Sequence, residues 1–97
     1  MSGRADIRRI IEEGLGSAGR LRILRVMASE DAPSYTRYGL EKLTGLSPAY
    51  VRKHLKVLVE TGWVKELKYG SSPVYALNLD DLKVKLLVDY FRKIGYL

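Results

Sequence analysis

Hydrophobic positions recur at helical spacing in five segments of the chain and form short extended stretches in two others. The spacing predicts helices over residues 4–13, 17–30, 36–45, 47–61 and 80–97. Residues 63–69 and 74–78 are predicted to be strands, because glycine, serine and proline between them favour a hairpin turn. Gly14 and Gly16 are expected to end the first helix.

The third and fourth predicted helices have clear boundary residues. Thr36 is placed to cap the third helix, whose Leu40 and Leu43 are expected to point inward. Ser47 is placed to cap the fourth, and Pro48 occupies its first position, where a missing N–H costs nothing. Only a tight turn therefore separates the two helices.

This order of elements predicts the fold class. A tight turn between two short helices is typical of a helix-turn-helix, and a hairpin directly after the second helix is typical of its wing. We therefore predict a mainly α-helical protein with a small β-hairpin, a winged helix-turn-helix with additional N- and C-terminal helices. The expected organisation is an N-terminal amphipathic helix (1–16), a winged helix-turn-helix DNA-binding domain (17–78) and a C-terminal dimerisation helix (79–97).

The helix predicted at 47–61 combines an apolar spine with a basic outer face. Val51, Leu55 and Leu58 fall within a narrow arc at about 100° per residue, whereas Lys53 and Lys56 lie on the opposite side. No acidic residue occurs from 47 to 59. A recognition helix needs this composition, because it packs on its own domain and enters the major groove; a solvated helix face is the alternative interpretation.

The candidate DNA contacts divide into base readers and phosphate contacts. Arg52 has a planar fork suited to a guanine edge, while Lys53 and Lys56 suit phosphate. The wing tip can contact phosphates or a minor groove, although an ordinary hairpin turn is the alternative. The predicted DNA-binding residues are Ser47, Ala49, Tyr50, Arg52, Lys53, Lys56, Lys68, Tyr69, Ser71 and Ser72. Three further basic residues, Arg20, Arg22 and Arg25, either add to the positive electrostatic field or face solvent.

The stretch GLSPAYVRKHLKVLVETGWV resembles the helix and strand entry of winged helix-turn-helix transcription regulators, particularly ArsR-like and MarR-like ones. RLRILRVMA and TRYGLEKLTGLS resemble the opening helix and the first helix-turn-helix member of that family, so the resemblance spans about residues 17–78. It implies a DNA-binding regulator whose terminal helices form a dimer. The chain departs from the metal sensors among ArsR relatives, because it has no cysteine and one histidine. We therefore expect no metal and no cofactor, and we expect His54 to be a packing residue.

The last predicted helix carries more apolar surface than one domain covers. Its apolar residues span roughly 240° of the helical wheel, where one packed face needs only somewhat more than about 100°. Packing against a second copy is the preferred explanation, and folding back over its own core is the alternative. The predicted dimer contacts are Ile7, Ile10, Ile11, Leu82, Leu86, Leu87, Tyr90, Phe91 and Ile94.

Composition narrows the class of partner. The formal charge of +6 and the pI near 9.7 favour a polyanion, and no run of apolar residues is long enough to span a membrane. We predict a homodimeric, cytoplasmic regulator of transcription that binds double-stranded DNA; a protein-interaction subunit of a transcription or replication assembly is the alternative. An enzyme is not expected, because no catalytic pattern is present. Abundant Lys, Arg and Glu with little Cys, Asn or Gln suggests a thermophilic or archaeal source.

Overall fold

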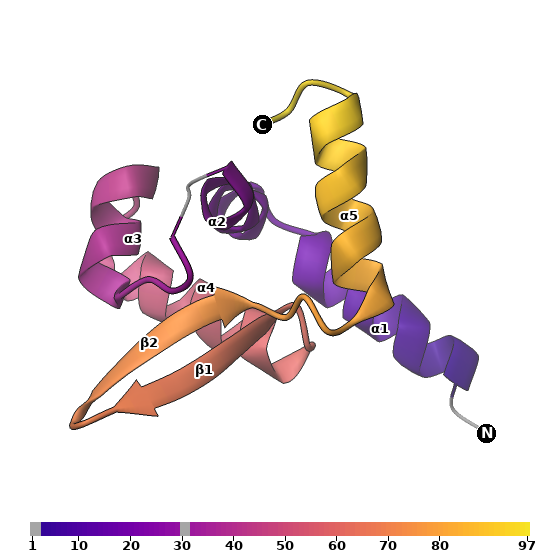
Figure 1. Ribbon diagram of the computed structural model, residues 1–97. Coiled ribbons are helices and arrows are strands. Elements are labelled where there is room, and N and C mark those ends of the chain that lie inside the picture. Colours follow the sequence, from indigo (N-terminus) through magenta and orange to yellow (C-terminus); the bar gives the residue numbers. More distant parts are fainter. Residues whose placement is uncertain (1–2, 30–31) are drawn as a thin grey trace.

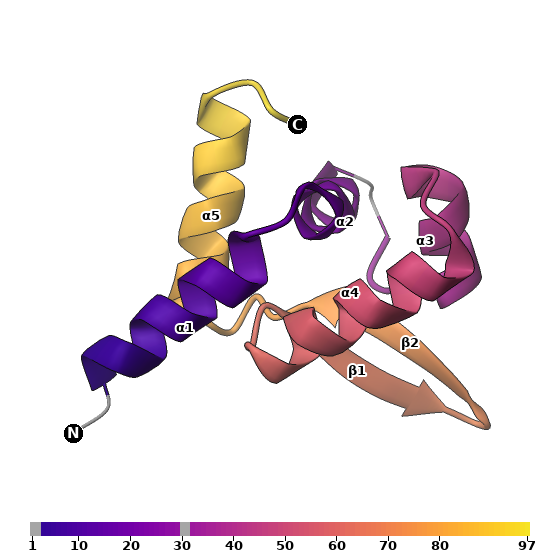
Figure 2. The same cartoon turned by 180° about the vertical axis from the view of Figure 1, so that it is seen from behind.

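The computed structural model describes residues 3–29 and 32–97 and has the predicted architecture (Figure 1). The described elements are α1 (Gly3–Leu15), α2 (Ala18–Ser29), α3 (Arg37–Thr44), α4 (Pro48–Glu60), β1 (Val64–Tyr69), β2 (Ser72–Leu77) and α5 (Leu82–Lys93). This order confirms a mainly α-helical winged helix-turn-helix with additional terminal helices. Figures 1 and 2 show α2 nearly end-on, with α3, α4 and α5 arranged around it.

Caps fix both helices of the helix-turn-helix. The Thr36 Oγ1 accepts a hydrogen bond from the Gly39 N–H at 3.0 Å, and the Ser47 Oγ accepts one from the Tyr50 N–H at 3.3 Å. Gly45 ends α3 in the left-handed region at φ 75°, which glycine adopts without the steric cost of a Cβ. Residues 45–47 alone therefore separate α3 from α4, as predicted.

The hairpin is antiparallel and lies against α4 (Figures 1 and 2). Its register runs from the pair Val64↔Leu77 to the pair Tyr69↔Ser72, which leaves a two-residue turn with Gly70 at φ 66°. A positive φ at the first central residue suits a tight hairpin turn. Tyr35 adds a bridge on the outer side of β2, exchanging two 2.8 Å backbone hydrogen bonds with Tyr75. The chain segment before α3 is thereby tied to the wing.

The core lies where α2, α3, α4 and α5 meet. Its largest fully buried side chains are Trp63, Ile23, Leu24, Leu40, Leu55, Leu58, Val51 and Val84. The Val51–Leu55–Leu58 spine of α4 is thus fully buried, as predicted. Each such side chain stabilises the fold by roughly 1.5–3 kcal/mol relative to exposure, so α4 is firmly anchored.

Helix α1 does not break at Gly14, which corrects the sequence prediction. The indole N–H of Trp63 donates to the Ile10 carbonyl at 3.1 Å, and a Cβ built at Gly14 would lie 2.0 Å from that indole nitrogen. Gly14 therefore lies within α1 because the ring occupies the space that any side chain would need. This contact fastens α1 to the strand entry after α4.

The predicted packing of Leu43 and the predicted end of the last helix were also wrong. Leu43 is 48% exposed, while its neighbour Thr44 is buried and donates its hydroxyl to the Leu40 carbonyl at 2.6 Å. That internal hydrogen bond lets a threonine take a core position on the short α3. Helix α5 ends at Lys93 rather than Leu97, since Gly95 adopts φ 80° and turns the chain back.

The returning C-terminus covers part of the core. The Tyr96 ring contacts Phe91 edge-on, with 4.8 Å between ring centroids, and the Arg25 Nε donates to the Tyr96 carbonyl at 2.8 Å. The C-terminal end accordingly turns towards α2 in Figure 1. These contacts bury Phe91 to 5% exposure, so it does not fit the predicted set of dimer contacts.

Candidate nucleic-acid interface

The outer face of α4 presents the basic residues that the sequence predicted. Ala49, Lys53 and Lys56 are exposed on the side opposite the buried spine, and Ser47 and Tyr50 are exposed at the helix start. Among the described residues, neither Lys53 nor Lys56 makes an ion pair. Both ammonium groups are therefore available to an external anion.

His54 lies on the opposite flank of α4 and is a packing residue, as predicted. Its side chain is 8% exposed, stacks on Tyr50 with ring centroids 5.8 Å apart, and has Nδ1 3.4 Å from an Arg20 guanidinium nitrogen. A Cβ at Gly19 would lie 2.5 Å from Nε2, so the ring sits directly against the α2 backbone. Burial, and then the charges of Arg20 and Lys53, lower the pKa of His54. The ring is neutral at pH 7.

The arginines of α2 hold this helix to its neighbours. Arg22 donates to the Thr44 carbonyl at 3.5 Å, Arg25 donates to Tyr96, and Arg20 lies against His54. The Arg25 guanidinium also lies 5.5 Å from the centroid of the Tyr96 ring. Arg22 and Arg25 are exposed to solvent, which was one of the two alternatives, and all three side chains also make contacts within the domain.

The wing tip projects beyond the body of the domain (Figure 1). Lys68, Tyr69, Ser71 and Ser72 are all exposed there, and Tyr69 is among the most exposed large side chains. The Lys68 side chain makes no ion pair with another described residue. The tip thus offers one cation, one ring and two hydroxyl groups to a partner.

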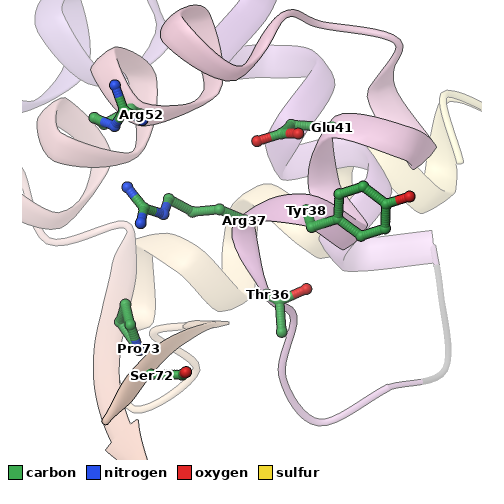
Figure 3. A pocket seen from close by; sticks show the side chains of 7 residues that line it. All are labelled: Thr36, Arg37, Tyr38, Glu41, Arg52, Ser72 and Pro73. Carbon is green, nitrogen blue, oxygen red and sulfur yellow. The ribbon is translucent and has the colours of Figure 1, made fainter.

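A cavity of about 320 Å³ opens between the start of α3, the flank of α4 and β2; we call it the α3–wing notch. Its lining residues are Thr36, Arg37, Tyr38, Glu41, Arg52, Ser72 and Pro73. Figure 3 shows the Arg37 side chain extending from α3 into the space between Arg52 above and Pro73 and Ser72 below. The notch brings two predicted residues, Arg52 and Ser72, together with Arg37.

Arg37 is a candidate contact that sequence reasoning missed. It stands directly after the Thr36 cap and four residues before Glu41 on the same helix, and only the packing of α3 against α4 places it near Arg52. Arg52 itself lies on a flank rather than on the outermost line of α4. It also borders a second cavity, of about 310 Å³, lined by Leu55, Lys56, Val59, Glu60, Glu66 and Tyr75.

A second exposed surface is apolar and lies on the terminal helices. Leu82, Leu86 and Tyr90 recur along one side of α5, and Ile94, the C-cap residue, continues the same spacing; each is 57–67% exposed. Ile7 and Ile11 of α1 are also exposed, whereas Ile10 and Leu87 are partly buried against the core. Among the predicted dimer contacts, these six exposed side chains are the ones that a second copy can cover.

Within residues 3–29 and 32–97, no group of three His, Asp or Glu side chains is placed to hold a metal ion. No helix in the same ranges is long and apolar enough to cross a membrane.

Several solved structures share this fold. A homodimeric winged helix-turn-helix DNA-binding domain from Mycobacterium bovis, a possible ArsR-family regulator, matches with a TM-score of 0.77 at 18% identity, covering 97% of this chain and 82% of that one. HlyU from Vibrio cholerae matches at 0.76 and 20% identity, over 95% and 94% of the two chains. The transcriptional repressor BigR from Xylella fastidiosa matches at 0.74 and 22%, over 97% and 91%.

Sequence comparison identifies the family directly. No curated protein matches the chain significantly. The model of the family described as "Bacterial regulatory protein, arsR family" matches residues 17–66, just over half of the chain, from the start of α2 into β1. The protein therefore belongs to the ArsR family of bacterial regulatory proteins.

Proposed function

We propose that the protein binds specific sequences of double-stranded DNA as a homodimer and regulates transcription. The observation that carries this proposal is the exposed, unpaired basic face of α4, held rigidly by a fully buried spine. The match to a homodimeric winged helix-turn-helix DNA-binding domain supports it. Such a regulator acts on DNA in the cytoplasm and carries out no catalysis.

The α4 helix is proposed to enter the major groove. Ser47, Ala49 and Tyr50 stand at its exposed start and are placed to meet base edges, while Lys53 and Lys56 contact phosphates. The wing, residues 68–73, would lie along the backbone or the adjacent minor groove through Lys68, Tyr69, Ser71 and Ser72. Arg52 has a guanidinium group that can read a guanine edge, and it lies on the flank of α4 that faces the α3–wing notch.

The dimer is proposed to form through the exposed apolar side of α5, extended by Ile7 and Ile11 of α1. A twofold axis beside α5 would cover its three exposed apolar side chains and Ile94 with their counterparts in the second copy. Residues 17–78 then form the DNA-binding domain, and residues 1–16 and 79–97 form the dimer contacts. Two α4 helices about 34 Å apart would read half-sites one helical turn apart.

Neutralising the outer face of α4 tests the proposal. The variant Lys53→Gln/Lys56→Gln should flatten the dependence of DNA affinity on salt by about two phosphate contacts, each contributing about 0.9 to the log–log slope. The measurement is a fluorescence anisotropy titration of a labelled duplex across salt concentrations. Lys85→Gln/Arg92→Gln is a matched control, because it removes the same charge from an exposed side of α5. An unchanged slope in the α4 variant would count against the proposal.

The exposed apolar side of α5 favours a second candidate, a protein-interaction subunit of a transcription or replication assembly. That function predicts a monomer with little DNA affinity at moderate salt, whose α5 docks on another protein. A gel shift with random duplex, beside a sizing measurement, separates the two candidates. A homodimer that shifts DNA supports the regulator, and a monomer that does not supports the subunit.

A further inference from the structure

The α3–wing notch gathers positive charge from two separate elements. Arg37 comes from the first turn of α3 and Arg52 from the second turn of α4, and both line the same cavity (Figure 3). Arg37 is half-buried and Arg52 is exposed. The packing of α3 against α4 thus holds two guanidinium groups at one opening that water can enter.

These two guanidinium groups differ from those of Arg9, Arg20, Arg22 and Arg25. Arg9 pairs with Glu13, and Arg20, Arg22 and Arg25 make the internal contacts described above. Among the described residues, neither Arg37 nor Arg52 has such a hydrogen bond or ion pair. Two like charges around one cavity repel each other, and an anion between them converts that repulsion into attraction.

The lining also suits the geometry of a phosphate group. A guanidinium fork can give two parallel hydrogen bonds to phosphate oxygens, and the Ser72 hydroxyl on β2 adds a further donor. The opening lies between α4 and the wing. If α4 occupies a major groove, the DNA backbone at the edge of that groove would pass this opening. A phosphodiester of the bound DNA is therefore the anion that this location favours.

We propose that the α3–wing notch binds one phosphate group, a backbone phosphodiester of the DNA, which Arg37 and Arg52 hold together. This proposal rests on the proposed function and changes the role of one residue within it. Arg52 becomes a phosphate contact that ties α4 to the wing, rather than a reader of a guanine edge. Arg37 becomes a DNA contact on α3.

Glu41 gives the proposal a prediction of opposite sign. Its carboxylate lines the same notch and makes no ion pair with another described residue. A carboxylate beside a bound phosphate opposes binding through like-charge repulsion. Glu41→Gln should therefore tighten DNA binding a few-fold, because it removes this repulsion.

The first experiment measures duplex affinity against salt concentration by fluorescence anisotropy. Arg37→Gln and Arg52→Gln should each weaken binding about tenfold, since each removes a charge-assisted hydrogen bond. Because they share one phosphate, the double variant should lose only about 0.9 of the salt slope, whereas Lys53→Gln/Lys56→Gln should lose twice that amount. Lys42→Gln is the control, because it removes a charge from α3 outside the notch.

Sequence preference separates the two roles of Arg52. With DNA selected from a random pool, Arg52→Gln should weaken selected and random duplexes by the same factor. A loss of preference at one guanine position, with an unchanged salt slope, would overturn the proposal. Unchanged binding by Arg37→Gln would also overturn it, while a reduced slope in Lys53→Gln/Lys56→Gln would leave the proposed function standing.

A second arm separates a phosphodiester of DNA from free phosphate. Inorganic phosphate is added to isotope-labelled protein, and the Nε–H signals of Arg37 and Arg52 are followed by NMR. Weak, joint shifts of both signals, with far tighter binding of duplex, support the proposal. Saturation at low phosphate concentration with no effect of Arg37→Gln on duplex binding would reassign the notch to a free anion. Absence of any shift together with no effect on duplex binding would refute a phosphate site altogether.

Discussion

Helices α4 and α5 are both amphipathic, and they expose opposite kinds of side chain. Helix α4 buries Val51, Leu55 and Leu58 completely and presents lysines outward. Helix α5 buries Val84 and Phe91 but leaves Leu86 57% exposed on its other side. One helix therefore has a satisfied apolar face and unpaired charge, and the other has apolar surface that its own domain does not cover.

This difference indicates which partner each helix lacks. Exposed positive charge without an internal partner is free to pair with the phosphates of a polyanion, so it favours a partner such as DNA. An ordered stripe of exposed leucine, tyrosine and isoleucine side chains indicates a partner that removes it from water. In the proposed dimer, α5 finds that partner in a second copy and thereby sets the spacing of the two α4 helices.

The largest expected effect comes from placing charge in the α5 stripe. Leu86→Glu should dissociate the dimer, because the two copies together lose roughly 3–6 kcal/mol of apolar burial, at roughly 1.5–3 kcal/mol per leucine. Analytical ultracentrifugation should show a monomer with an unchanged far-ultraviolet circular dichroism spectrum. Lys85→Glu is the matched control, since it changes the charge on a neighbouring exposed position outside the stripe. A dimer that survives Leu86→Glu would contradict the proposed interface.

A core truncation in α4 should have the next largest effect. Leu55→Ala should lower the free energy of unfolding by about 2–5 kcal/mol, because it leaves a cavity under the recognition helix. Leu82→Ala in α5 should matter only at protein concentrations where the dimer forms. Urea unfolding at two protein concentrations measures both effects. Equal losses for the two variants at high dilution would mean that α5 is packed within one chain.

The sequence predicted α4 better than α5, and the reason is physical. The α4 caps and spine are local signals within residues 47–61, so periodicity and capping preferences were sufficient. Phe91 lies at helical spacing from the buried Val84, but apolar residues span most of the α5 wheel, so periodicity alone did not separate it from its exposed neighbours. In the fold it lies in the core, and the Tyr96 ring returns onto it. The glycine at position 14 of α1 is likewise explained by a residue far away in the sequence, because the Trp63 ring packs against it.

The candidate site shows the same limit. The basic residues of α4 were predicted because a single helix carries them on one face. Arg37 was missed because its closeness to Arg52 depends on the angle between α3 and α4, which no spacing in the sequence encodes. The sequence pattern placed Leu43 in the core because it did not reveal the hydrogen bond from the Thr44 hydroxyl to the Leu40 carbonyl. That hydrogen bond lets Thr44 occupy the core position instead.

A smaller effect is expected from the cap of α4. Ser47→Ala should lower the free energy of unfolding by about 1 kcal/mol, since the Tyr50 N–H loses its acceptor. Ser47→Gly should lower the free energy of unfolding by only about 0.3 kcal/mol, because glycine is itself tolerated as an N-cap. Urea unfolding of the two variants side by side measures the difference. Identical losses would show that the cap does not anchor the start of α4.

The smallest expected effect is the dependence of stability on pH that His54 of α4 contributes. The pKa of His54 is lowered from 6.5 in the folded protein, first by burial and then by Arg20 and Lys53. The unfolded chain then binds more protons, so the stabilisation is complete above pH 6.5 and is lost as the pH falls towards the folded pKa. His54→Gln should remove this loss, as measured by urea unfolding between pH 7.5 and pH 5.

No other histidine is present, which makes His54 the group to test. The pKa values of Asp80 and Asp81 are lowered by hydrogen bonds from Lys65 and Lys83, so these carboxyl groups titrate at still lower pH. A wild-type protein whose stability is flat across the His54 window would contradict the packing described for the α4 flank.

A hydroxyl-radical footprint on a selected duplex tests most directly whether a dimer joined through the apolar side of α5 places the basic residues of two α4 helices on the same DNA. Two copies joined through α5 should protect two backbone patches about 10 base pairs apart, one for each α4 helix. Leu86→Glu should remove the paired pattern at the same protein concentration. A single protected patch in the wild type, or a paired pattern that survives Leu86→Glu, would contradict the account.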